Sequence, residues 1–379
     1  MSKSIVLLLA LVILTAAFLA GANPAFGDEL VEDSWVPVAP LRVTPSPYSF
    51  AFGAVALDGQ IYFIGEGICE RYDPEANNWT TVTPPPANNG GGAVAACQNK
   101  IYVIGDPTLV YDPATDTWES RSALPITIIG YQANVVDGKI YVISGGKPAF
   151  YSITDPSGAN YVYAPETDAW SEMAPIPTPV DGYASAVIDN KIYIIGGGPA
   201  TGMLENATNI VQIFDPETNK WTNGTSMPTG VYKAGACSTS GLFAPKRIYV
   251  VGGNLYYNTG GILEPYAFWS GSNLNQVYDP NTGNWSTETF LPDSRWRPSL
   301  VNVNDTLYVV GGVSGIFADG GIIHVQACWK YIPTGYSETP IPNPTAEPFP
   351  TAPVLAASII AIVVGAGLLV YHKKRKRKV

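Results

Sequence analysis

The residues best suited to recognition chemistry lie in one segment of the last third of the chain, at about 254–275. Five aromatic side chains stand there among glycine, serine and asparagine: Tyr256, Tyr257, Tyr266, Phe268 and Trp269. Rings of this kind stack on saccharides or anchor in protein partners, while amides and hydroxyls supply directional hydrogen bonds. The segment therefore predicts a ligand-binding loop. The alternative is that it folds over and plugs the centre of its own domain.

A second candidate follows at Arg295-Trp296-Arg297, where two cations flank one ring. Guanidinium groups bind carboxylates bidentately, so this triplet could hold an acidic group of a ligand. The alternative is that the arginines pair with acidic neighbours such as Asp293.

Catalytic constellations are scarce. The chain has only two histidines, His324 and His372, so a cluster of histidine metal ligands and a Ser-His-acid set are both excluded. We expect no cofactor and no metal, and we assign no catalytic residue. His324 is expected to be a structural residue of the third strand of its repeat.

Charge separates the body of the chain from its ends. All 31 acidic residues lie between Asp28 and Glu347, together with 14 of the 21 basic ones, which leaves this body with a net charge of about −17. Phosphate binding needs clustered lysine and arginine, so nucleic acid is not expected as a partner. The 38 glycines and 33 prolines also exclude a helical bundle.

Both ends of the chain carry apolar runs. Lys3, the run 5–20 and the small residues Ala25 and Gly27 predict a signal peptide over 1–27, with an uncleaved anchor as the alternative. The segment 354–371 has no charge and is long enough to cross a bilayer as a helix of roughly 27 Å. The basic tail 372–379 then places the C-terminus in the cytoplasm and the body outside the cell.

A proline-rich segment, 334–353, precedes this apolar run and predicts a semi-rigid stalk. The stalk, the helix and the basic tail together resemble the C-terminal arrangement of many archaeal surface proteins. Some of those proteins are cut at this place by a sorting transpeptidase.

Between the ends, two phrases repeat. An Ile-Tyr or Leu-Tyr followed by aliphatic residues has its tyrosine at 62, 102, 141, 193, 249 and 308, with spacings of 40, 39, 52, 56 and 59. The second phrase, of the type Tyr-Asp-Pro-Glu-Thr-Asn-Lys-Trp, ends at tryptophans 79, 118, 170, 221 and 285. Such spacings are typical of propeller blades, in which four antiparallel strands, here named A to D, fill about 40 residues.

This pattern resembles the kelch repeat from Asp33 to Pro333. A double glycine after strand B stands at 145–146, 196–197, 252–253 and 311–312, whereas the first two units lack it. The resemblance implies an all-β, six-bladed kelch propeller over 28–333. Some six-bladed kelch proteins are sugar-anomer isomerases that use arginine and glutamate, a role that Arg295, Arg297 and Glu264 would match only loosely. The copper site of kelch-like galactose oxidases needs histidines that this chain lacks.

The sixth unit has no second phrase, and an unpaired Trp35 precedes the first unit. We expect the segment around Trp35 to supply strand D of the sixth blade and so close the ring, which removes the free sheet edges of an open array.

Because successive strands of a blade run in opposite directions, the B–C and D–A connections lie on one side of the disc, here called the mouth face. The A–B and C–D connections are short turns, apart from an insertion near 241–245, so a binding surface is expected on the mouth face. Weaker candidates on that face are Arg42, Tyr48, Tyr131, Asp181, Tyr232 and Lys233.

Four cysteines are present, and Cys69 and Cys97 fall in neighbouring blades where they could form a disulfide; buried thiols are the alternative. Five Asn-X-Ser/Thr triplets are candidate glycosylation sites: Asn78, Asn206, Asn223, Asn284 and Asn304.

These features predict a single-pass cell-surface protein whose propeller binds an extracellular protein or glycan. A membrane-anchored carbohydrate-active enzyme and a structural component of a surface layer are the alternatives.

Overall fold

The computed structural model describes residues 31–45, 52–65, 67–86, 92–149, 152–199, 207–254, 271–316 and 322–341. The predicted signal peptide, membrane helix and basic tail lie outside these residues, as do Tyr256, Tyr257, Tyr266 and Trp269. In the part that is described, every regular element is a strand, and no helix is long and apolar enough to span a membrane.

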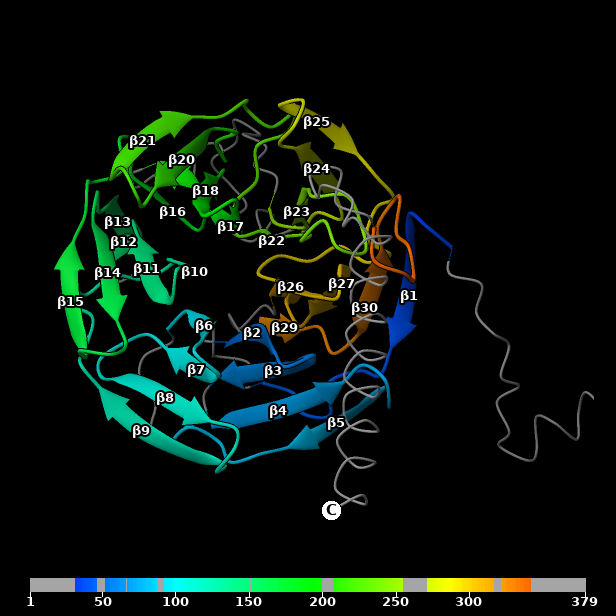
Figure 1. Cartoon of the computed structure of the whole chain (residues 1–379), viewed down its shortest axis with the longest axis horizontal. Helices are drawn as coiled ribbons and strands as arrows, with labels where there is room; N and C mark the ends of the chain where they lie inside the picture. Colours follow the sequence, from blue (N-terminus) through cyan, green and yellow to red (C-terminus); the bar gives the residue numbers. More distant parts are fainter. Residues whose placement is uncertain are drawn as a thin grey trace, which may run out of the picture.

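Six four-stranded antiparallel sheets surround a common centre as blades (Figure 1). The strands are given in the order A to D. The first three blades are β2 (Phe52–Leu57), β3 (Gln60–Gly65), β4 (Ile68–Asp73) and β5 (Asn78–Thr81); β6 (Val94–Cys97), β7 (Lys100–Val103), β8 (Thr108–Asp112) and β9 (Thr117–Arg121); and β10 (Ala133–Val136), β11 (Lys139–Ile143), β14 (Asn160–Ala164) and β15 (Ala169–Glu172).

The other three blades are β17 (Ala184–Ile188), β18 (Lys191–Ile195), β20 (Val211–Asp215) and β21 (Lys220–Asn223); β22 (Gly235–Ser238), β23 (Ile248–Val251), β24 (Asn275–Asp279) and β25 (Asn284–Thr287); and β26 (Ser299–Val303), β27 (Thr306–Val310), β30 (Cys328–Ile332) and β1 (Ser34–Val38). Three short pairs lie on the mouth face: β12 (Gly146–Ala149) with β13 (Ser152–Pro156), β16 (Val180–Asp181) with β19 (Gly198–Pro199), and β28 (Val313–Ile316) with β29 (Ile322–His324). His324 is therefore in β29 and not in strand C of its blade, which is a correction to its expected place.

The core is divided among the joints between blades. Six clusters of buried side chains each combine residues from two neighbouring blades, and each is built largely from the aliphatic residues and the tyrosine of strand B. Blades of this kind are buried on both faces, which explains why strand B is apolar along its whole length and does not alternate. The expected six-bladed all-β propeller is confirmed.

Strand A is followed in most blades by two polar or glycine residues, because these residues form the A–B turn. Five blades use a two-residue turn in which both residues have a positive φ: Asp58-Gly59, Gln98-Asn99, Asp137-Gly138, Asp189-Asn190 and Asn304-Asp305. This conformation matches the twist of a hairpin and favours Asn, Asp and Gly. The fifth blade instead has the expected insertion, and Asp305 accepts hydrogen bonds from the amides of Ser240, Leu242, Phe243 and Ala244 in it.

One set of contacts, the blade clamp, recurs at every joint. It centres on the residue just beyond strand D, whose carbonyl accepts a hydrogen bond from the indole Nε1 of the next blade's tryptophan at 2.8–3.1 Å. The pairs are Ala39 with Trp79, Thr83 with Trp118, Ser122 with Trp170, Ala174 with Trp221, Thr225 with Trp285, and Thr289 with Trp35. Each tryptophan thus connects its own blade to the preceding one.

The amide of the same residue completes the clamp. At five joints it donates to the side chain of an Asn or Asp that ends the next blade's C–D turn in the left-handed conformation, at 2.8–3.0 Å. These acceptors are Asn77, Asp116, Asp168, Asn219 and Asp33. The fifth blade has Gly283 at this place, with φ +69°, and so lacks the contact.

Ring closure follows the same pattern although its parts come from opposite ends of the chain. Strand β1 pairs antiparallel with β30, and Trp35 lies opposite Tyr331 with ring centroids 4.8 Å apart. Trp35 and Asp33 fill the clamp positions that one continuous phrase supplies in the other blades. The expected closure by the segment around Trp35 is confirmed.

The start of the proline-rich segment lies against the propeller. The amides of Ser337 and Ile341 donate to the carbonyls of Phe243 and Leu242, and the rings of Tyr336 and Phe243 stack at 6.4 Å. The Gly335 amide donates to the Glu32 carboxylate. Residues 335–341 therefore lie on the side of the short turns, as does Glu32.

The four cysteines are unbonded thiols; Cys69 and Cys97 are buried in separate clusters. Burial raises the pKa of both thiols. The alternative to the Cys69–Cys97 disulfide is thus what the structure records.

We expect Trp35→Ala to lower the free energy of unfolding by about 2 kcal/mol, because it removes a ring contact and an indole donor at the closing joint. Trp118→Ala, at an internal joint, should cost a similar amount, whereas Phe290→Ala, at an exposed ring, should change stability little. Denaturant unfolding of the full chain measures all three. A neutral Trp35→Ala would show that the ring is not closed by β1.

We expect Gly283→Asn to be about 1 kcal/mol more stable than Gly59→Asn, because both variants carry the backbone cost of a β-carbon in the left-handed region and only Gly283→Asn restores the missing clamp acceptor. A β-carbon at position 283 meets nothing nearer than 3.7 Å, and Asn77 and Asn219 already adopt this backbone conformation. The control is Gly59→Asn, at a positive-φ glycine without a clamp. Equal melting shifts for the two variants would contradict the role given to the clamp.

Candidate functional site

The mouth face is organised by four D–A connections that enter blades three to six. Each contains one residue in the left-handed conformation: Gly130, Gly182, Lys233 and Arg297, with φ between +53° and +72°. Their backbones are linked in series, because the amides of Gly182, Lys233 and Arg297 each donate to the carbonyl of the preceding member at 2.6–2.9 Å. Equivalent positions of successive blades thus form a continuous hydrogen-bonded arc at the mouth.

The glycine that ends each strand B lets these connections approach closely. A β-carbon at Gly197 would lie 2.8 Å from the Asp181 carbonyl oxygen, and one at Gly253 would lie 3.0 Å from that of Tyr232. The equivalent pair in blade three is Ser144-Gly145, where Ser144 has φ +57° and hydrogen bonds to the Val180 backbone. The double-glycine position of blade three is therefore Ser144-Gly145, one residue before the pair 145–146 that the glycines in the sequence predict.

Two of the four left-handed positions carry cations where the other two have glycine. The Nζ of Lys233 lies 4.5 Å from the centre of the Tyr232 ring and 5.3 Å from that of Trp296. The guanidinium carbon of Arg297 lies 5.4 Å from the Trp296 ring. Both cations are half-buried, so two positive charges share one aromatic platform in a body that is otherwise acidic.

An acid completes this group. Tyr232 donates its hydroxyl to Oδ2 of Asp181 at 2.7 Å. Burial raises the pKa of Asp181, against the hydrogen bond from Tyr232 and the charges of Lys233 and Arg297. Burial first, and then the charge of Arg297, hold the pKa of Lys233 well below its usual range, and burial lowers the pKa of Arg297 to about 10. We call these four residues and Trp296 the mouth cluster.

The other arginine of the triplet has a structural position. Arg295 is fully buried, and its guanidinium forms a two-pronged ion pair with Asp293 and donates to the carbonyls of Gly311 and Ala327. Trp296 is also fully buried. The expectation that Arg295 faces a ligand is therefore not supported by its geometry, which matches the alternative of pairing with Asp293.

Tyr131, a weaker candidate, is structural as well, because its buried hydroxyl donates to the Ile104 carbonyl of the preceding blade. Asp181, Tyr232 and Lys233, weaker candidates in the sequence, lie together in the mouth cluster. The sequence could have singled out Lys233 and Arg297 by their place in the repeat, because the equivalent residues of blades three and four are glycines. Among the residues with described positions, no group of three or more His, Cys, Asp or Glu could hold a metal ion.

Comparisons with known proteins agree with this architecture. The kelch-motif family model matches residues 179–228, which include the whole of blade four. The chain is 32% identical to Kelch-like protein 35 of Mus musculus over 44% of this chain and 29% of that protein, and 24% identical to Alpha-scruin of Limulus polyphemus over 72% and 30%. It spans about a third of the length of the curated relatives it matches.

A solved structure, described as the structure of YjhT, superposes with a TM-score of 0.61 at 19% identity, over 76% of this chain and 95% of that one. At this identity the likeness concerns the fold. The six blades with their two repeated phrases, the matching motif and the superposition together identify the chain as a kelch-repeat β-propeller.

Proposed function

We propose that this chain is a cell-surface binding protein whose mouth face recognises an extracellular protein or glycan. Kelch propellers typically mediate protein–protein interaction, which supports a protein as the first partner class to test. The observation that carries the proposal is the pair of cations, Lys233 and Arg297, held side by side on Trp296 at the mouth.

Backbone strain strengthens this argument. A residue with a β-carbon in the left-handed conformation costs roughly 1 kcal/mol relative to glycine, and such outliers gather at functional sites. Glycine serves at the same place in blades three and four, so the fold itself does not require Lys233 or Arg297. We infer that the two cations are retained to bind a carboxylate or another anionic group of the ligand.

Four of the five candidate glycosylation sites lie on the outer strands or on the opposite face. Asn78, Asn223 and Asn284 are exposed at or beside the outer strands, and Asn304 is exposed in a turn of the opposite face. Glycans at these asparagines would not cover the mouth cluster. The fifth triplet, Asn206, lies outside the described residues. The position of Glu32 and of residues 335–341 on the short-turn side would likewise point the mouth away from an anchoring membrane.

The cell-surface part of the proposal rests on the apolar runs 5–20 and 354–371 and on the basic tail. With cleavage of the signal peptide and a single C-terminal span, the propeller would lie outside the cell and the tail inside.

An enzymatic alternative has one observation in its favour. Asp181, with a raised pKa, and Lys233, with a lowered one, stand in the same cluster, and oppositely shifted groups are typical of acid–base sites. The alternative is a membrane-anchored, sugar-isomerase-like enzyme.

Protease added to intact cells should release the propeller and leave the basic tail with the cells. The readout is immunoblotting with one epitope in the A–B insertion of blade five and another at the C-terminus. Detergent-permeabilised cells are the control, in which both epitopes should be lost. Protection of the propeller in intact cells, with loss of the tail, would reverse the proposed topology.

Lys233→Met and Arg297→Met should each weaken binding by roughly thirtyfold, because a desolvated anchor typically contributes about 2 kcal/mol. Binding partners are first sought by glycan array and surface pull-down with the purified full chain, and affinities are then measured by calorimetry. Glu217→Ala, on the opposite face, is the matched control and should stay within twofold. If the mouth variants abolished conversion of a sugar without weakening its binding, the enzymatic alternative would replace the proposal.

A further inference from the structure

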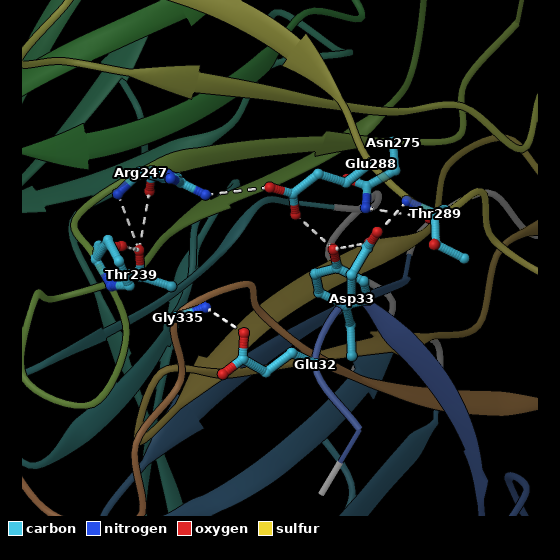
Figure 2. Close-up of polar contacts among 10 residues, drawn as sticks. Glu32, Asp33, Thr239, Arg247, Asn275, Glu288, Thr289 and Gly335 are labelled. Carbon is cyan, nitrogen blue, oxygen red and sulfur yellow. Dashed lines mark hydrogen bonds and ion pairs between the residues drawn. The ribbon is translucent and has the colours of Figure 1, made fainter.

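The joint that closes the ring contains an arrangement found at no other described joint. The Tyr331 hydroxyl lies 2.6 Å from Oδ1 of Asp33 and 2.5 Å from Oε2 of Glu288. In Figure 2 the dashed lines from the carboxylates of Asp33 and Glu288 meet at one unlabelled oxygen, which belongs to the Tyr331 hydroxyl. A hydroxyl carries a single proton and donates to one acceptor at a time. With both carboxylates ionised, one of these two close oxygen–oxygen contacts would have no hydrogen between its atoms.

The other joints show what the ordinary arrangement is. Tyr111 donates to Asp116 at 2.6 Å and Tyr163 to Asp168 at 2.7 Å, and each hydroxyl has a single carboxylate acceptor. Those contacts need no additional proton. Glu288 therefore distinguishes the closing joint.

The repeat register shows that Glu288 is a departure from the pattern. It stands directly before the clamp residue Thr289, at a position that is apolar or glycine at four of the other joints, as Val38, Val82, Met173 and Gly224. The fifth has Arg121, which is a cation. An acidic side chain at this place puts a second carboxylate beside the hydroxyl of Tyr331, which also bonds to Asp33.

The surroundings of Glu288 supply one cation for two carboxylates. Arg247, directly before β23, donates to its Oε1 at 3.1 Å (Figure 2), while Tyr249 in β23 and Thr334 beyond β30 are its uncharged polar neighbours. Asp33 accepts the Thr289 amide. If both carboxylates are ionised, the joint has a net charge of −1, and one added proton makes it neutral.

We propose that the ring-closing joint holds one additional proton, shared between Glu288 and the Tyr331 hydroxyl, and that closure of the propeller by β1 weakens when a rise in pH removes this proton. In the protonated state Glu288 donates to the Tyr331 oxygen and Tyr331 donates to Asp33, so each close contact has its hydrogen. Loss of the proton leaves two carboxylates facing one hydroxyl.

The titration of Glu288 agrees in direction. Burial raises its pKa, and the nearby charge of Asp33 raises it further, against the hydrogen bond from Tyr331 and the charge of Arg247. A group with a raised folded-state pKa stabilises the fold fully below its unfolded value of about 4.3, and this stabilisation is lost as the pH rises through the folded value. The pH dependence that Asp168 contributes to stability has the opposite sign. The Tyr163 hydroxyl lowers its pKa, so its contribution is present above about pH 3.9 and is lost in acid.

The test is hydrogen exchange of the full chain, read at the amides of Val36 and Val38 in β1, because alternate amides of this edge strand face β30. Between pH 5 and pH 8 their protection factors, corrected for the intrinsic rate, should fall more than twofold in the wild type, because the closed joint holds a proton that the open joint releases more readily. Glu288→Gln keeps an amide donor toward Tyr331 and does not titrate, so its protection should change less than twofold. Glu288→Met, which copies the residue at the joint before blade four, provides a second non-titrating variant.

Asp168→Asn is the matched control at a joint with a single carboxylate, and it should retain the wild-type fall in β1. A flat wild-type profile from pH 5 to pH 8, or the same fall in both Glu288 variants, would overturn the proposal. The wild-type profile decides even if one variant does not fold.

Discussion

The propeller depends on one residue per joint whose backbone carbonyl, and at five of the six joints also its amide, forms a hydrogen bond across the gap between blades. Its carbonyl receives the tryptophan indole and its amide is received by the turn residue, so a chain segment without regular hydrogen-bond partners is satisfied by the next blade. Each contact is worth about 1 kcal/mol, but the six joints form a closed ring, and every joint also buries a core cluster. Blade packing and ring closure are therefore a single constraint.

That constraint explains what the sequence could predict. The clamp needs a tryptophan at a fixed distance from an Asp-Pro turn, so the phrase is visible five times, and the isolated Trp35 points to the missing sixth member. The acceptor at the end of the turn was harder to recognise, because Asn and Asp are common in turns for local reasons and their partner lies in another blade. Asp33 shows the difficulty best, since its clamp partner, Thr289, is 256 residues away.

The site was less predictable than the fold because cationic and aromatic residues serve structure and recognition alike. Arg295 and Arg297 are two residues apart, yet one is fully buried on Asp293 and the other shares the Trp296 platform at the mouth. Composition cannot separate them. Only the backbone does so, because Arg297 has φ +53° and takes the place of a glycine, whereas Arg295 lies in extended pairing with Ser272.

The mouth cluster and the closing joint share blades five and six. Lys233 enters blade five and Arg297 enters blade six, and the Arg297 amide bonds to the Lys233 carbonyl, so the spacing of the two cations is set by how these blades pack. The same packing is held at its outer edge by Trp35, Asp33 and Glu288, and at its core by the cluster that includes Tyr331. A proton at the outer edge that strengthens closure would therefore also fix the distance between the charges that face the ligand. The proposed recognition at the mouth and the closure of the ring thus depend on the same packing between blades five and six.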